Sequence, residues 1–204
     1  MSPRKLIVAA IAVIAVASGA WLSYRTPAPP LEPRVATVLP GSAALPDFAL
    51  LDHTGATVGA DFFEGQWDLV FFGFTHCPDI CPLTLQVLAD ARRQLAEMGT
   101  EPLPRIVLVS VDPERDTPAK LAQYVSYFGD QNAGITGELD ELRKLTGALG
   151  IWFEKSSLGG DNYAVDHAAA VLLIGPEGGY RAVFSTPHEA ANFVHDLPII
   201  MGSQ

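Results

Sequence analysis

Residues 68–74 read DLVFFGF, a run that is apolar at every position after Asp68. A short, continuous apolar run rich in aromatic and β-branched residues is typical of a central strand that is buried on both faces of a sheet. Such a strand must be covered on both faces by other elements. The run therefore restricts the chain to a layered architecture in which helices pack on a sheet.

The neighbouring segments supply those layers. Apolar residues recur at helical spacing over residues 82–98, and residues 105–111 form a second β-branched run, so strand, helix and strand follow each other as a parallel unit. A parallel unit followed by an antiparallel hairpin and a final helix predicts a single α/β domain of the thioredoxin-like sandwich type. The other elements expected are strands at 47–51, 151–154, 168–174 and 180–185, and helices at 117–128, 138–149 and 187–199.

The N-terminus has the pattern of a segment that inserts into a membrane. Arg4 and Lys5 precede residues 6–22, which contain no charged residue, and Arg25 closes the run. Positive charges before the run place the N-terminus inside, so residues 1–25 are predicted to be a single-pass anchor in a bacterial inner membrane, with the domain in the periplasm. The alternative is a cleaved signal peptide and a soluble periplasmic protein.

The next segment, residues 26–45, is rich in proline and poor in large apolar residues, and it is predicted to be an extended linker. Residues 46–204 then form the thioredoxin-like domain. A chain of this length needs only one core.

Charge and cysteine content exclude several functions. The 13 Lys and Arg against 23 Asp and Glu give a net charge of −10 without a basic cluster, so we expect no nucleic-acid binding and a better fit to a basic protein partner. Two cysteines in the whole chain rule out a disulfide-stapled scaffold and a site of four thiolates.

Both cysteines stand where the central strand ends and its helix is expected to begin. Pro78 suits the first helical turn, which places Cys77 at the N-cap and Cys81 four residues later on the same face. At that separation two sulfurs can form a disulfide or bind one metal ion, so geometry leaves both uses open. A purely structural bridge is disfavoured, because closing so short a loop stabilises little.

Among the five histidines, His167 is the best placed to be a third ligand. It precedes a predicted core strand, and in thioredoxin-like folds the corresponding loop, which carries a proline in thioredoxins, faces the helix that bears the cysteines. Two thiolates and an imidazole suit Cu(I), and also Cu(II) when a fourth ligand is added, whereas structural zinc requires four ligands. Asp166 either orients the imidazole of His167 as a hydrogen-bond acceptor or only begins the strand.

Three motifs resemble the Sco/SenC family: GFTHCPDICP at 73–82, VDPERDTP at 111–118 and VDH at 165–167. The resemblance covers residues 46–199. It implies a membrane-tethered, thioredoxin-fold copper protein that assists insertion of copper into the binuclear site of cytochrome c oxidase, with Cys77, Cys81 and His167 as the ligands. Its implied partners are the copper-accepting oxidase subunit and another periplasmic copper chaperone. Asp112 and Asp116 are expected to shape a turn and a helix start at the rim of the site, facing a partner and not binding the metal.

The sequence therefore predicts a metallochaperone that holds copper and passes it on by ligand exchange, and not an enzyme with turnover. The alternative is a periplasmic thiol-disulfide oxidoreductase in which Cys77 attacks and Cys81 resolves, keeping the cysteines of a copper-accepting partner reduced. The three-residue spacer between the cysteines and the absence of a proline beside His167 count against that alternative. A peroxidase is weaker still, because Thr75 stands two residues before Cys77 and not three.

Overall fold

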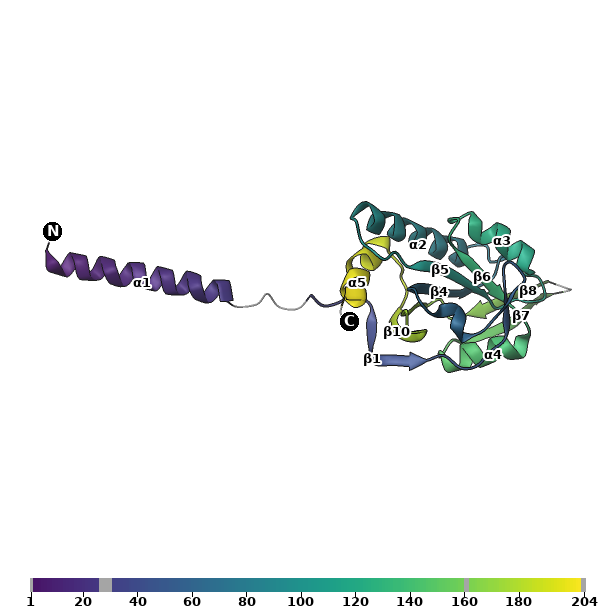
Figure 1. Ribbon diagram of the computed structural model, residues 1–204. Helices are drawn as coiled ribbons and strands as arrows, with labels where there is room; N and C mark the ends of the chain where they lie inside the picture. The colour runs from purple at the N-terminus through teal and green to yellow at the C-terminus, as the bar shows by residue number, and fades with distance from the viewer. Residues whose placement is uncertain (1, 26–30, 160–161, 203–204) are drawn as a thin grey trace. The chain divides into compact units, whose positions relative to one another are not determined.

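A computed structural model describes residues 2–25, 31–159 and 162–202. The chain forms two compact units, Met1–Glu32 and Pro33–Gln204, each considered by itself. The first unit contains helix α1 (Pro3–Arg25), drawn in purple in Figure 1. Among the residues with described positions, no helix is both long and apolar enough to cross a membrane. The uncharged run at residues 6–22 lies within helix α1.

The second unit is built on a mixed eight-stranded sheet with the order β1-β10-β9-β4-β5-β6-β2-β3. Strand β4 runs parallel to β5 and antiparallel to β9, and β5 runs parallel to β6. Helix α2 packs against α5 and α3 packs against β6, while α4 lies on the opposite side of the sheet from α2 and α3 (Figure 1). This is the predicted mixed α/β sandwich.

The sheet strands are β1 (Thr37–Ala44), β2 (Leu50–Asp52), β3 (Thr57–Val58), β4 (Asp68–Gly73), β5 (Arg105–Ser110), β6 (Ala133–Thr136), β9 (Val171–Ile174) and β10 (Gly179–Phe184). The helices are α2 (Ile80–Glu97), α3 (Pro118–Ser126), α4 (Leu139–Ala148) and α5 (Ala190–Gly202), with a short 3-10 helix at Ala60–Phe63. Strands β7 (Phe153–Gly159) and β8 (Asn162–His167) pair with each other, and among the described strands with no other, as a separate hairpin.

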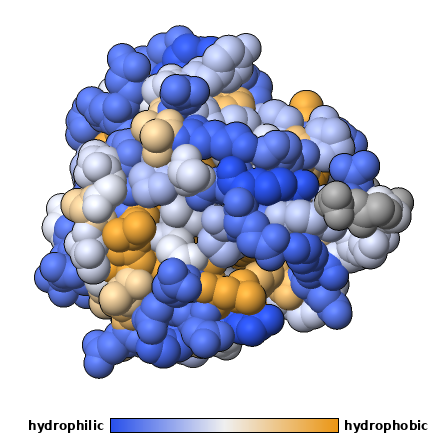
Figure 2. Space-filling model, turned by 90° about the vertical axis from the view of Figure 1, so that its right-hand side faces the viewer, coloured by the Kyte–Doolittle hydropathy of each residue, from blue (hydrophilic) through white to orange (hydrophobic). Residues whose placement is uncertain are grey.

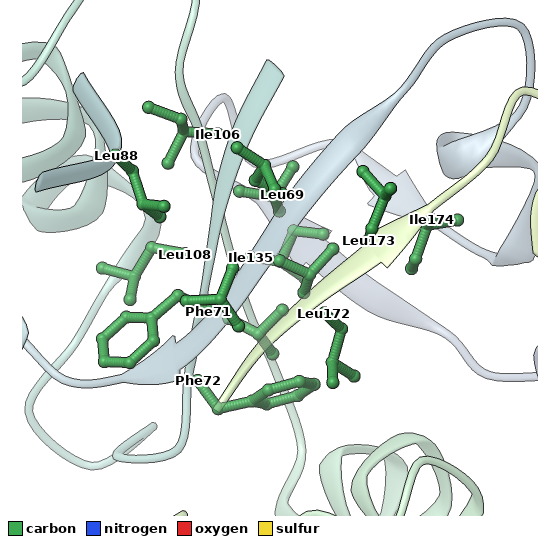
Figure 3. Close-up of a cluster of buried hydrophobic side chains, with 14 of the residues drawn as sticks. Leu69, Phe71, Phe72, Leu88, Ile106, Leu108, Ile135, Leu172, Leu173 and Ile174 are labelled. Carbon is green, nitrogen blue, oxygen red and sulfur yellow. The ribbon is translucent and has the colours of Figure 1, made fainter. Parts of the chain in front are cut away.

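The core surrounds β4, which is buried along its whole length, as the apolar run predicts. Leu69 and Phe71 from β4 lie among side chains from β5, β9 and α2, as Figure 3 shows. Removing one side chain of this size from water contributes roughly 1.5–3 kcal/mol to the stability of the folded state. The hairpin predicted across residues 176–179 is also present, as the antiparallel pair β9 and β10.

The folded unit begins earlier than predicted. Strand β1 lies inside the segment expected to be a linker, and it pairs antiparallel with β10 at the edge of the sheet. Pro40 is tolerated because the strand is at an edge and its register shifts between Val38 and Ala43, so no ladder hydrogen bond is required from the proline. The boundary therefore lies near Pro33 and not at residue 46. Residues 26–30 of the predicted linker lie outside the described residues.

A buried carboxylate ties the segment before β1 to helix α5. The Asp196 side chain is fully buried and accepts hydrogen bonds from the backbone N–H groups of Arg34 (2.7 Å), Val35 (2.9 Å) and Ala36 (2.9 Å). Burial alone would raise the pKa of Asp196, but these bonds and a further one from His195 hold that pKa below its usual value. The ionised carboxylate therefore stabilises the start of the folded unit.

Replacing Asp196 with Asn is expected to lower the free energy of unfolding by about 1–3 kcal/mol at pH 7, because an amide N–H₂ would face backbone donors. The carboxylate stabilises fully above the unfolded pKa of about 3.9, and its contribution is lost as the pH falls through the lower folded pKa. The variant should therefore lose less stability than the wild type below about pH 4. Urea denaturation at pH 7 and pH 3.5 measures both effects, with exposed Asp130→Asn as the control. Equal stability of D196N and wild type at pH 7 would contradict this assignment.

Candidate metal centre

The two cysteines lie at the junction of β4 and α2, as predicted, but the helix begins later than expected. Its N-cap is Asp79, so Cys77 lies in the preceding loop and not at the cap. The sulfur of Cys77 nevertheless accepts the backbone N–H of Cys81 at 3.4 Å. One of the N–H groups left unpaired at a helix start therefore points at this sulfur. Both thiols are free, with Cys77 partly exposed and Cys81 buried.

Cys81 is held against the end of the central strand. A Cβ atom at Gly73 would lie 2.9 Å from the Cys81 sulfur and 2.9 Å from the ring of Phe71, so only glycine allows this approach. Burial raises the pKa of the Cys81 thiol, and the neighbouring Cys77 raises it further. The sulfur of Cys81 therefore keeps its proton until a partner or a metal ion displaces it.

His167 is the last residue of β8, and its Nε2 lies 3.5 Å from the Cys81 sulfur. The imidazole meets the rings of Phe71 and Phe74 edge-on, with centroids 5.9 and 6.0 Å away. Its Nδ1 lies 3.2 Å from the carbonyl oxygen of Ala168. Because a carbonyl only accepts, Nδ1 carries the hydrogen, and the lone pair of Nε2 is directed at Cys81.

The imidazole is held in its neutral form. Burial lowers the pKa of His167, and this effect outweighs the opposing influence of the Ala168 carbonyl and the charge of Asp166. A neutral imidazole with a free Nε2 is the form that ligates metal ions. The acceptor at Nδ1 is thus the Ala168 carbonyl and not the predicted Asp166, whose exposed carboxylate acts on His167 through its charge alone.

The structure therefore brings the three predicted ligands together. They come from the β4–α2 loop, the first turn of α2 and the end of the β7–β8 hairpin, and they form an open set of two sulfurs and one nitrogen. Soft thiolates with an imidazole suit a soft ion such as Cu(I) better than a hard ion. The face that carries β7 and β8 is mostly hydrophilic, with separate apolar patches (Figure 2).

A buried polar cluster lies beside the site, and the sequence pattern does not reveal it. Asp112 and Asp116 were expected at the rim, yet both side chains are buried. Asp112 pairs with Arg115 and accepts the Tyr163 hydroxyl at 2.7 Å. The Arg115 guanidinium also lies 3.7 Å from the centre of the Tyr163 ring. Burial, together with the bond to Asp112, raises the pKa of Tyr163 to about 12. These contacts fasten the strand that carries His167 to the segment after β5.

Replacing Gly73 with Ala is expected to cost about 1–3 kcal/mol of unfolding free energy, because the new methyl group would push Cys81 and Phe71 from their places. Gly147→Ala in α4 is the matched control. Its Cβ would meet nothing within 4 Å, and alanine favours a helix, so stability should stay equal or rise. Urea unfolding of the two variants measures the difference, and a G73A protein as stable as G147A would refute the close packing.

Comparisons with known proteins agree with this geometry. The model of the SCO1/SenC family matches residues 37–202. The chain is 35% identical over 167 residues to a protein of Stutzerimonas stutzeri that bears the name of a copper-binding protein, which covers 82% of this chain and 81% of that one.

Solved structures show the same fold. The chain superposes on Arabidopsis thaliana ScoI with copper bound at a TM-score of 0.74 and 29% identity, covering 79% of this chain and all of the other. A second neighbour is BsSco, described as a member of the Sco family of cytochrome c oxidase assembly proteins. It has a TM-score of 0.61 and 23% identity over 80% of this chain and 96% of that one, and this likeness concerns the fold alone.

Proposed function

The chain belongs to the SCO1/SenC family, and on that premise we propose that it is a metallochaperone that holds copper and delivers it for assembly of cytochrome c oxidase. The observation that carries the proposal is the approach of three ligand groups from separate segments. Nε2 of His167 faces the sulfur of Cys81 at 3.5 Å, and the sulfur of Cys77 lies 3.4 Å from the amide nitrogen of Cys81. Copper is the cargo of this site.

The three groups differ in access, and this difference suits transfer. Cys81 is buried and His167 is mostly buried, whereas Cys77 is partly exposed. A partner's ligand therefore reaches copper from the side of Cys77 and replaces the sulfurs one at a time. Binding of copper requires both thiols to lose their protons, and the raised pKa of Cys81 makes proton release part of loading.

The proposed acceptor is the copper-accepting subunit of cytochrome c oxidase, and the proposed donor is another periplasmic copper chaperone. Support comes from family membership and from the copper-bound relative described above. The net charge of −10 favours partners with a basic contact surface.

The proposed location is the bacterial periplasm. Arg4 and Lys5 followed by the uncharged residues 6–22 form the pattern of an export segment.

A second candidate function is reduction of a partner's disulfide, and the unequal burial of the thiols favours it. The accessible Cys77 thiolate would attack the partner disulfide and form a mixed disulfide, releasing one partner thiolate. Cys81 would then attack the Cys77 sulfur, which leaves a Cys77–Cys81 disulfide here and a reduced dithiol on the partner. Two electrons pass to the partner from the Cys77–Cys81 dithiol, which is the reductant.

Replacing His167 with Ala separates the two functions. We expect Cu(I) affinity to fall at least about tenfold, or about 1.4 kcal/mol, because the site loses its only nitrogen ligand. Reduction of a model disulfide should persist, since both thiols remain. Competition with a chromophoric Cu(I) chelator measures the affinity of the full chain. His53→Ala is the control, because His53 accepts the backbone N–H of Gly134 at 3.3 Å, away from the thiols. Unchanged Cu(I) affinity of H167A would remove His167 from the site.

A further inference from the structure

Thr75 lies in the loop between β4 and Cys77, and one carboxylate holds both of its polar groups. The backbone N–H of Thr75 donates to Oδ2 of Asp116 at 2.8 Å, and its hydroxyl donates to Oδ1 of the same residue at 2.5 Å. The Asp116 side chain has no exposure to solvent. Two short bonds to a buried carboxylate define both the place and the orientation of Thr75.

Asp116 is in turn fixed to the sheet. The hydroxyl of Ser110, the last residue of β5, donates to Oδ2 of Asp116 at 2.7 Å, and the backbone N–H of Asp116 donates to the Asp112 carbonyl at 3.0 Å. Through Asp116, the position of Thr75 is therefore fixed relative to strand β5.

The constraint extends to the metal-binding loop. The backbone N–H of Cys77 donates to the Phe74 carbonyl at 3.2 Å and closes a turn around Thr75. A shift of Thr75 must therefore shift Cys77. The opposite wall of the site needs no such support, because Cys81 is packed under Gly73 and His167 lies between aromatic rings.

The charge of Asp116 is partly balanced from the solvent side. Lys120 Nζ and His76 Nδ1 lie 4.0 and 3.9 Å from Oδ1, and both side chains are partly exposed. Three hydrogen bonds and a nearby cation offset the free-energy cost of burying this carboxylate. Among the contacts of the described residues, Asp116 makes no hydrogen bond with either thiol or with the His167 imidazole. Its charge raises the pKa of the Cys81 thiol, and its hydrogen bonds reach the metal-binding loop through Thr75.

We propose that Asp116 and Thr75 are positioning residues that set the Cys77 sulfur relative to Cys81 and His167 before copper arrives. This inference rests on the proposed copper site and adds the residues that preorganise its exposed thiol. Without the clamp, the loop would have to order when copper binds, at a cost in affinity.

The test compares Thr75→Val, Thr75→Ser and Asp116→Asn in the full chain. Thr75→Val removes the hydroxyl at nearly constant volume, whereas Thr75→Ser keeps it. Loss of an outer hydrogen-bond partner typically weakens metal binding about 10- to 100-fold, and that loss is expected for T75V and D116N but not for T75S. The matched control is Thr84→Val on α2, because the buried Thr84 hydroxyl has no hydrogen-bond partner in the described part of the chain. T84V should bind Cu(I) like the wild type.

Two further measurements separate loss of copper binding through misfolding from loss through a displaced Cys77. Urea unfolding identifies a variant that is not folded; if D116N fails this check, the comparison of T75V with T75S decides. The equilibrium constant of the Cys77–Cys81 disulfide with glutathione needs no copper, and T75V should shift it at least about threefold while T75S and T84V leave it unchanged.

The possible outcomes separate the two proposals. Wild type that fails to bind Cu(I) contradicts the proposed function, and the glutathione equilibrium then tests the positioning role by itself. Wild type that binds Cu(I), with T75V binding equally well or T75S losing as much as T75V, overturns the positioning role and leaves the proposed function standing.

Discussion

The structure depends on the complete burial of β4 between β5 and β9. A strand enclosed on both sides cannot slide without exposing apolar side chains, so the point where it ends is fixed in space. Helix α2 follows after the loop that carries Cys77, and the absence of a side chain at Gly73 lets the sulfur of Cys81 rest against the strand. Placement of the buried thiol is thus a consequence of core packing.

The other side of the site depends on polar contacts. Asp116 holds the loop that carries Cys77, and Asp112 with Arg115 holds Tyr163 on the strand that ends at His167. Buried charges are stable only with partners. Asp116 has its partner in Thr75 and Asp112 has its partner in Arg115, and these two pairs lie on either side of the candidate ligands. In the described part of the chain, the hairpin that supplies His167 pairs with no strand of the main sheet, which explains why it needs side-chain anchors.

Much of the fold was predictable because its signals are local. Three signals are each made by residues that are close together in the sequence: the apolar run at β4, the helical spacing in α2 and the turn between β9 and β10. Strand β1 was missed because Pro40 and the prolines before the strand are typical of a linker, and only pairing with β10 makes it a strand. The short strand β6 was missed because Ala133–Thr136 offers too few residues for a pattern. The helix start was misplaced because Pro78 fits either side of the N-cap.

The amino-acid sequence by itself determined the α/β layering and the three candidate ligands, since residue type and spacing carry that information. Tertiary structure alone decided which groups surround them. The Ala168 carbonyl replaces Asp166 at His167, Thr75 meets Asp116 across 41 positions of the chain, and Asp196 meets Val35 across 161 positions. The last two contacts join distant segments that only the packing of the sheet and helices brings together. The bond to Ala168 depends on how the chain turns as it leaves β8, and residue type does not reveal that turn.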